Sequence, residues 1–275
     1  MRRRRRYRLL VTDVDGTLVP ESKVVPPGVI DAIHRAQARG IKVCLATGRP
    51  WQATRPFVEA VGADSPVIIY NGGLVYDFAA DRVLARTALP QAVARAVLPV
   101  LRRFPDTSPL LFLHGQVYAE RSTPLTKLYE HRDRPLVIEE TPSFQALLDA
   151  SPDEDPLKML IVGDPSDLKA MGDALGALPV AVNRVFSQKD YLEILPVGND
   201  KGRALPVLAA ALGVAVGETV AVGDAHNDLA MIRTAGLGVA VETSPPDVIA
   251  AAAWTCPPPE QEGLRVVIDR LFLDQ

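Results

Sequence analysis

The chain of 275 residues contains little that would direct it to a membrane or to an oxidising compartment. No apolar run approaches the ~20 residues that a membrane-spanning helix needs, and the N-terminus lacks an apolar signal region ending in small residues. Only two cysteines occur, Cys44 and Cys256, and both lie in apolar stretches, which argues against a disulfide framework and predicts buried, reduced thiols. We therefore expect a cytoplasmic protein with no membrane partner.

Charge of one sign is also scarce, because the net charge is −3 and 23% of the residues are charged. The block Arg2–Arg6 is typical of a solvated terminus, so nucleic acid is not expected as the main partner. Apolar residues make up 48% of the chain, enough for a sizeable core, and the length favours one large domain or a domain with an insertion. A monomer or weak homodimer is expected.

The most informative stretch is Leu9–Leu18, with the sequence LLVTDVDGTL. An apolar run leads directly into Asp13 and Asp15, which predicts a buried strand ending in a charged turn. Two carboxylates ~4 Å apart repel by about 4 kcal/mol at an effective dielectric of about 20. A bound divalent cation would turn this repulsion into attraction. The alternative is that both aspartates are ordinary turn residues.

The same pattern recurs along the chain. Apolar strands are predicted over Ile41–Thr47 and Pro66–Gly73, and each ends in polar and glycine residues, while helical spacing predicts a helix over Val29–Gly40. Alternating strands and helices indicate an α/β fold with a doubly wound parallel sheet, in which ligands bind at the carboxyl ends of the strands.

The middle of the chain has a different pattern of predicted elements, with short strands, several prolines and interspersed helices. It predicts an inserted α+β domain over residues 85–188, between a first core part at 1–84 and a second at 189–275. In this interpretation the apolar segment that starts at Tyr191 already belongs to the second part of the core. Two further short core strands are expected at Gly238–Val241 and Ala252–Cys256.

Polar residues collect at the predicted strand ends and at one helix start: Asp13, Asp15, Thr47, Lys201, Asp224 and Asp228. This set resembles the four motifs of the haloacid dehalogenase (HAD) superfamily, which stand in order as DVDGT, Thr47-Gly48-Arg49, Lys201 and GDAHND. The long insertion and the NGG at Asn71–Gly73 further resemble the Cof-type phosphatase branch, which has an α/β cap at this point. The resemblance implies a Rossmann-like HAD core and an aspartate-based phosphatase.

The chemistry of phosphoryl transfer accounts for the acidic residues. Asp13 is the expected nucleophile, which forms an acyl phosphate that water later attacks. Asp15 is expected to protonate the leaving oxygen and then to deprotonate that water. Gly16 lets the chain turn at low steric cost, so that neighbouring backbone N–H groups can hold phosphate oxygens.

The remaining residues are expected to bind charge. Lys201 supplies a cation and Thr47 a hydroxyl donor. Substrate contacts are expected from Gly48, Arg49, Asn71 and Asn227. The alternative for Asn227 is a contact with the ligands around the metal. The oxygen-rich donors suit Mg²⁺. By the resemblance, it is held by Asp13, the backbone carbonyl of Asp15, and Asp224, with Asp228 binding through water or orienting its neighbours.

Each of these residues also has an ordinary structural interpretation. Thr47 would then cap the helix that follows it, Asp228 would be a first-turn acid, and Lys201 would be an exposed lysine. The positive end of a helix is an unfavourable place for a cation, which favours a functional role for Lys201.

The predicted function is therefore Mg²⁺-dependent hydrolysis of small phosphorylated metabolites, with sugar phosphates as the expected class. The alternatives are a phosphomutase of the same superfamily and a non-catalytic sugar-phosphate sensor. Receiver domains use similar residues but are much shorter, and dehalogenation would leave Asp15 without a role. Departures from the family pattern at Gly238–Ser244 and Thr255–Leu264 leave the substrate open.

Overall fold

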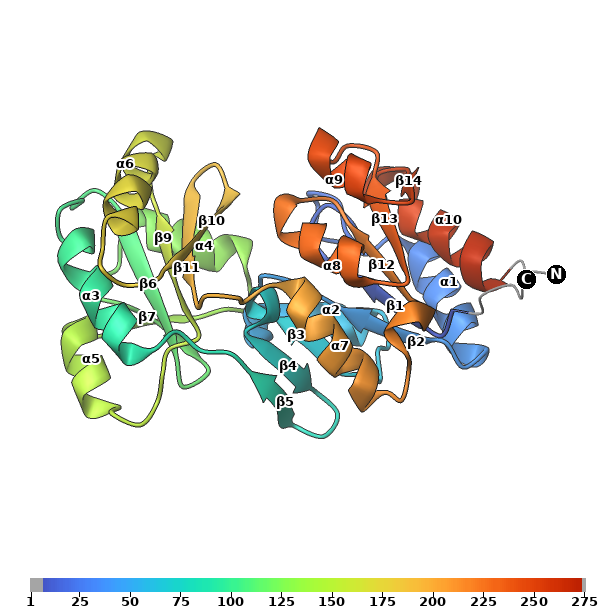
Figure 1. Cartoon of the computed structure of the whole chain (residues 1–275), viewed down its shortest axis with the longest axis horizontal. Helices are drawn as coiled ribbons and strands as arrows, with labels where there is room; N and C mark the ends of the chain where they lie inside the picture. Colours follow the sequence, from blue (N-terminus) through green and yellow to red (C-terminus); the bar gives the residue numbers. More distant parts are fainter. Residues whose placement is uncertain (1–6, 274–275) are drawn as a thin grey trace. The chain divides into compact units, whose positions relative to one another are not determined.

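The structure, a computed structural model of the chain, describes residues 7–273. The arginine block at Arg2–Arg6 lies outside these residues. The chain divides into two compact units (Figure 1). The core unit contains the residues up to Arg49, Thr54–Arg86 and those from Asp200 onward, and the cap unit contains Pro50–Ala53 and Thr87–Asn199.

A parallel five-stranded sheet forms the centre of the core unit. Its strands run in the order β14-β13-β12-β1-β2, with the bounds β1 Leu9–Thr12, β2 Lys42–Leu45, β12 Thr219–Gly223, β13 Leu237–Val241 and β14 Trp254–Cys256. Strand β1 lies between β12 and β2, and all four of its residues are buried. The apolar run that precedes Asp13 is therefore explained by burial on both faces of the sheet, and the predicted parallel α/β sheet is confirmed.

Helices cover this sheet. They are α1 Pro27–Ala38, α7 Lys201–Ala211, α8 Leu229–Thr234, α9 Pro246–Ala251 and α10 Gly263–Ile268. Helix α2 (Trp51–Ala60) begins with residues of the cap unit and continues in the core unit from Thr54. Leu205 and Leu208 of α7 and Met231 of α8 belong to one buried cluster with Leu9 and Val11 of β1. Helices α1 and α10 pack against each other beside the sheet (Figure 1). The helix start at Lys201 is thereby held directly against the central strands.

The third predicted core strand differs in part from expectation. Strand β3 (Val67–Ile69) joins the core sheet only through an isolated parallel bridge between Ala46 and Ile68. It forms its own antiparallel sheet with β4 (Leu74–Asp77) and β5 (Arg82–Arg86). An apolar run alone does not show with which strand it will pair, because its side chains would be buried in the core sheet and in the antiparallel sheet alike.

The cap unit contains a six-stranded sheet in the order β10-β11-β9-β6-β7-β8, which is antiparallel except for the pair β7 and β8. The strands are β6 Ser108–Leu113, β7 Gln116–Ala119, β8 Ile138–Glu140, β9 Lys158–Val162, β10 Asn183–Gln188 and β11 Tyr191–Leu195. Its helices are α3 Gln91–Leu101, α4 Pro124–Arg132, α5 Phe144–Ala150 and α6 Pro165–Gly176. Residues of α3, α5 and α6 share a buried cluster with Leu111, Met159 and Leu192. The predicted α+β insertion is confirmed.

Strand β11 belongs to the cap unit and not, as the sequence interpretation predicted, to the core unit. Strand β11 was expected to open the second part of the core at residue 189, but it pairs antiparallel with β9 and β10 in the cap sheet. The return to the core unit follows at Asp200. The reason is that Tyr191–Leu195 is a fully buried apolar strand, a pattern that does not distinguish the two sheets.

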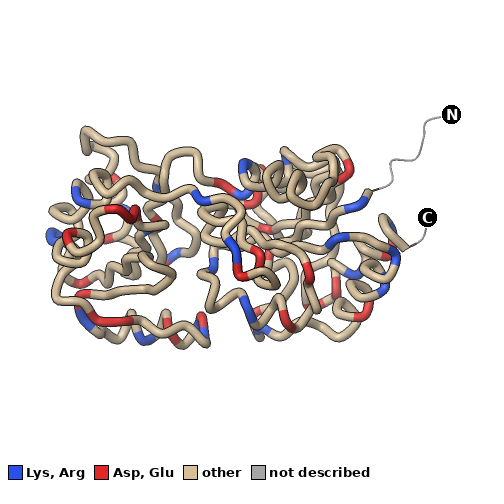
Figure 2. Tube along the Cα trace, turned by 90° about the horizontal axis from the view of Figure 1, so that it is seen from below, with Lys and Arg blue, Asp and Glu red and all other residues tan. Residues whose placement is uncertain are grey.

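The general expectations from composition can also be compared with the structure. Cys44 and Cys256 are free and buried. Lys and Arg are interspersed with Asp and Glu along the described chain (Figure 2). Among residues 7–273, no helix combines the length and apolar character that crossing a bilayer requires.

The core packing gives a direct test of the assignment. Leu205 of α7 is fully buried, whereas Val207, two residues along the same helix, is 41% exposed. We expect Leu205→Ala to lower the free energy of unfolding by about 2–5 kcal/mol, because it leaves a cavity against β1. Val207→Ala should change it by no more than about 0.5 kcal/mol. Urea unfolding of both variants measures the difference, and equal effects would contradict the packing described.

Candidate active site

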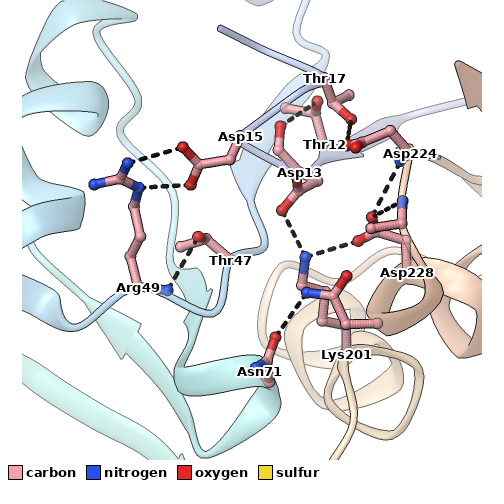
Figure 3. Close-up of polar contacts among 12 residues, drawn as sticks. Thr12, Asp13, Asp15, Thr17, Thr47, Arg49, Asn71, Lys201, Asp224 and Asp228 are labelled. Atoms are coloured by element: carbon pink, nitrogen blue, oxygen red, sulfur yellow. Dashed lines mark hydrogen bonds and ion pairs between the residues drawn. The ribbon is translucent and has the colours of Figure 1, made fainter. Parts of the chain in front are cut away.

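The carboxyl ends of β1 and β12 bring acidic side chains from distant parts of the chain together (Figure 3). The two strands are parallel neighbours, with Thr12 opposite Val222. Asp13 therefore emerges beside Asp224, and its backbone N–H donates to the carbonyl of Val222 at 2.9 Å. Asp228 follows in the short helix η3 (His226–Asp228). One carboxylate oxygen from each of Asp13, Asp224 and Asp228 lies within 4.8 Å of the others.

Lys201 lies among these acids. Its Nζ donates to Oδ1 of Asp13 at 2.6 Å and to Oδ1 of Asp228 at 2.7 Å, and the lysine is fully buried. The helix that carries it is capped by Asp200, whose carboxylate accepts from the N–H of Arg203 at 2.8 Å. A buried ammonium is stable only when it is paired and hydrogen-bonded. Lys201 is therefore a buried charge held by the acidic cluster and not an exposed helix lysine.

Asp228 uses both carboxylate oxygens within the protein. Oδ1 accepts from Lys201, and Oδ2 accepts from the backbone N–H groups of Asp224 and Ala225, each at 3.1 Å. The residue is fully buried. These contacts fit the role of orienting Lys201 and Asp224, one of the two roles considered for it from the sequence.

Burial and mutual repulsion shift the titration of the cluster. Burial, followed by the charges of Asp228, Asp224 and Asp15, raises the pKa of Asp13 well above its ordinary value despite the opposing charge of Lys201. Burial and the charge of Asp228 raise the pKa of Asp224 to about 6. Burial would lower the pKa of Lys201, but Asp13 and Asp228 raise it above its usual range. The described cluster thus carries more negative charge than one lysine neutralises.

Such a cluster fits a hard divalent cation. Its donors are carboxylate oxygens, which Mg²⁺ prefers, and a cation would relieve the repulsion that raises the pKa of Asp13 and Asp224. The turn after Asp13 leaves space for Asp224: Gly16 has a φ of +82°, and a Cβ there would lie 2.5 Å from Oδ2 of Asp224. Thr17 donates its hydroxyl to Oδ1 of Asp224 at 2.7 Å and holds this carboxylate in place.

Asp15 points away from the cluster. Its carboxylate accepts from Nε of Arg49 at 2.6 Å, from Nη2 of Arg49 at 2.8 Å, and from Nζ of Lys23 (Figure 3 draws the Arg49 contacts). Burial would raise the pKa of Asp15, but the hydrogen bonds and charge of Arg49, together with Lys23, lower it to about 2. Two carboxylates separated by one residue therefore have opposite electrostatic environments.

The hydroxyl and amide residues form one further side of the site. Thr47 is buried, and its Oγ1 accepts from the backbone N–H of Arg49 at 3.1 Å. Its carbonyl accepts from the N–H of Asn71 at 3.0 Å, and Nδ2 of Asn227 donates to Oδ1 of Asn71 at 3.0 Å. A Cβ at Gly48 would lie 3.0 Å from the amide of Asn71, so glycine permits this close approach.

The core unit thus brings together the residues proposed from the sequence: Asp13, Asp15, Gly16, Thr47, Gly48, Arg49, Asn71, Lys201, Asp224, Asn227 and Asp228. Two polar contacts were not anticipated, those of Thr17 with Asp224 and of Lys23 with Asp15. Thr17 is part of the DVDGT motif, so the motif could have indicated it. Lys23 stands outside every motif, and its left-handed φ of +58° is not a signal that a lysine gives in a sequence.

Comparisons with known proteins agree with this geometry. The model of the haloacid dehalogenase-like hydrolase family matches residues 10–268, and the chain belongs to that family. The pyridoxal phosphate phosphatase YbhA of Escherichia coli is 28% identical over 85% of this chain and 87% of its own length. The HMP-PP phosphatase of Serratia proteamaculans is 30% identical over 88% of this chain and 86% of its own.

The fold has a solved counterpart. A haloacid dehalogenase-like hydrolase from Bacteroides thetaiotaomicron has a TM-score of 0.86 and 29% identity, covering 97% of this chain and 100% of that chain. The resemblance inferred from the four motifs is confirmed, and so is the assignment to the hydrolases.

The raised pKa of Asp224 predicts how a metal should respond to pH. We expect Mg²⁺ to bind about tenfold more weakly at pH 5 than at pH 7.5, because protons compete for a carboxyl with a pKa of about 6. Titration calorimetry at the two pH values measures this. Equal affinities would contradict a ligand role for Asp224.

The same shift predicts a pH-dependent stability without metal. Since the pKa of Asp224 is raised from 3.8 to about 6 on folding, its contribution to stability is fully present below pH 3.8 and is lost as the pH rises through about 6. We expect Asp224→Asn to remove this loss, which thermal unfolding between pH 4 and 8 in a chelating buffer would measure. An unchanged pH profile would count against the shift.

Proposed function

We propose that this hydrolase is a Mg²⁺-dependent phosphomonoester phosphatase that forms an aspartyl phosphate on Asp13. The observation that carries the proposal is the placement of the Asp13 carboxylate, 2.6 Å from Nζ of Lys201 and beside Asp224. A nucleophilic carboxylate next to a fixed cation and an acidic metal-type cluster suits transfer of a dianionic phosphoryl group. The phosphatase names of the relatives support the same reaction.

In the first half of the reaction, a carboxylate oxygen of Asp13 forms a bond to phosphorus while the bond to the leaving oxygen breaks. Lys201 balances negative charge on the transferring group, and Thr47 would donate its hydroxyl to a phosphoryl oxygen. Asp15, whose pKa Arg49 and Lys23 lower despite its burial, would first take up a proton from solvent and then pass it to the leaving oxygen, which departs as an alcohol. In the second half, Asp15 takes a proton from the water that attacks phosphorus and releases Asp13.

The residues that would hold Mg²⁺ are Asp13 and Asp224, together with the backbone carbonyl of Asp15. When bound, the ion neutralises charge on the nucleophile and on the phosphoryl oxygens. Asp228 would keep Asp224 and Lys201 in place through the hydrogen bonds described above, and Asn227 would fix Asn71 at the phosphate side.

The substrate class is proposed as small phosphorylated metabolites. The relatives named above are phosphatases of pyridoxal phosphate and of HMP-PP, which are compatible with that class, and sugar phosphates were the class expected from the sequence. The loops at Gly238–Ser244 and Thr255–Leu264 depart from the family pattern, so the substrate of this chain need not be that of either relative.

Asp13→Asn provides the decisive test. We expect hydrolysis of 4-nitrophenyl phosphate in the presence of Mg²⁺ to fall by at least about 10³-fold, because the amide cannot accept the phosphoryl group. Chelation of the metal should have a comparable effect. Asp31→Asn is the matched control, since Asp31 is an exposed core-unit aspartate paired with Arg35. It should retain full activity.

The same assay separates the alternatives. Release of inorganic phosphate with each turnover indicates a phosphatase, whereas transfer of phosphate between positions of a sugar without release indicates a mutase. Full activity of Asp13→Asn would refute the mechanism, and absence of turnover on a broad set of phosphate esters would favour a sensor.

A further inference from the structure

One carboxylate oxygen of Asp15 is shared by two cations. Oδ1 accepts from Nη2 of Arg49 at 2.8 Å and also from Nζ of Lys23. Like charges held this close repel each other unless negative charge lies between them, and the Asp15 carboxylate lies between these two. One carboxylate therefore holds an arginine and a lysine at the edge of the site.

The two cations are held very differently. The Arg49 side chain is 6% exposed, lies over the ring of Phe57 at 5.1 Å, and contacts both oxygens of Asp15. The Lys23 side chain is 41% exposed and reaches Asp15 through one ammonium group on a flexible stem. Of the two, Lys23 is the cation that can leave Asp15 at low cost.

Space is available for such a movement. Lys23 is the one basic residue that lines a pocket of about 220 Å³ in the described core unit, together with Gly16, Asp224 and Thr243 and the acids Glu21 and Glu260. The pocket therefore adjoins both the turn that follows the nucleophile and the proposed metal ligand. A lysine that leaves Asp15 would have space beside Gly16 and Asp224.

The charges of the site favour keeping Lys23 close when a phosphate is bound. Among the residues of the acidic cluster and its printed ion pairs, four carboxylates (Asp13, Asp15, Asp224 and Asp228) accompany three cations (Lys23, Arg49 and Lys201). With these groups ionised and a divalent metal bound, the net charge is one positive, and a dianionic phosphoryl group makes it one negative. Without Lys23 the same complex would carry two negative charges, which opposes phosphate binding.

We propose that Lys23 is a phosphate-binding residue that Asp15 holds in the free protein and that the phosphoryl group of the substrate takes over. This rests on the proposed function, which supplies the phosphate ester. The exchange frees a lone pair on Oδ1 of Asp15 as the substrate arrives, so binding and the release of the proton-transfer group are coupled. Arg49 keeps Asp15 oriented throughout.

Inorganic phosphate is the probe for the first measurement. Titration calorimetry with and without Mg²⁺ should show that Lys23→Met raises the Kd for phosphate about tenfold, the value of one charge-assisted hydrogen bond. Lys23→Arg should recover most of this loss. Lys42→Met is the matched control, because Lys42 is 42% exposed and pairs with Asp64 in the same unit, and its Kd should match the wild type.

The second measurement tests the exchange itself. In an Asp15→Asn background Lys23 no longer has to leave a carboxylate, so phosphate should bind more tightly and Lys23→Met should cost clearly more than tenfold. An unchanged Kd in Lys23→Met would overturn the proposal. So would an equal loss in both backgrounds, because that result would mean that Lys23 acts only as a distant charge.

Turnover separates this proposal from the proposed function. If hydrolysis of 4-nitrophenyl phosphate depends on Asp13 but the Kd for phosphate is unchanged in Lys23→Met, only the proposed role of Lys23 is refuted. If phosphate binding follows Lys23 while no phosphate ester is turned over, the proposed reaction fails and the anion site stands. Urea unfolding of each variant checks that the core unit remains folded.

Discussion

The interaction on which the site depends is the buried contact of Lys201 with Asp13 and Asp228. Burying an ammonium is costly unless acidic groups pair with it, so the surrounding structure must hold these acids in well-defined positions. Parallel pairing of β1 with β12 places Asp13 beside Asp224. The N-cap Asp200 makes helix α7 begin at Lys201, and two backbone N–H groups donate hydrogen bonds to Asp228. The sheet, the helix start and the short η3 turn are thus fixed by one electrostatic requirement.

Asp13 and Asp15 show how a single turn can prepare two carboxylates for different tasks. Burial and the neighbouring acids raise the pKa of Asp13, whereas Arg49 and Lys23 lower the pKa of Asp15 despite its burial. Environments that push the titration of neighbouring acids apart are a common way to assign separate chemical roles. Gly16 makes the arrangement possible, because its backbone turns back where any side chain would meet Asp224.

Much of this arrangement could be predicted from the sequence, for a definable reason. The apolar run before Asp13 predicts a buried strand, and parallel strands place the residues at their carboxyl ends along one edge of the sheet. Residues as distant in the chain as Asp13 and Asp224 could therefore be grouped from the sequence alone. The pairing of β11 was not predictable, since a buried apolar strand suits either sheet equally well. Lys23 was missed because its contact with Asp15 depends on the path of a loop, and loop paths are set by tertiary packing rather than by local pattern.

The wide separation of the site residues along the chain has a consequence for synthesis. Asp13 emerges from the ribosome early, yet its partners Lys201 and Asp224 follow only after the whole inserted unit has been translated. A nascent or truncated chain that ends before Lys201 therefore contains Asp13 without the buried lysine that pairs with it, and it lacks the neighbouring strand β12. The contact of Asp13 with Lys201 can therefore form only after both parts of the core unit have been translated.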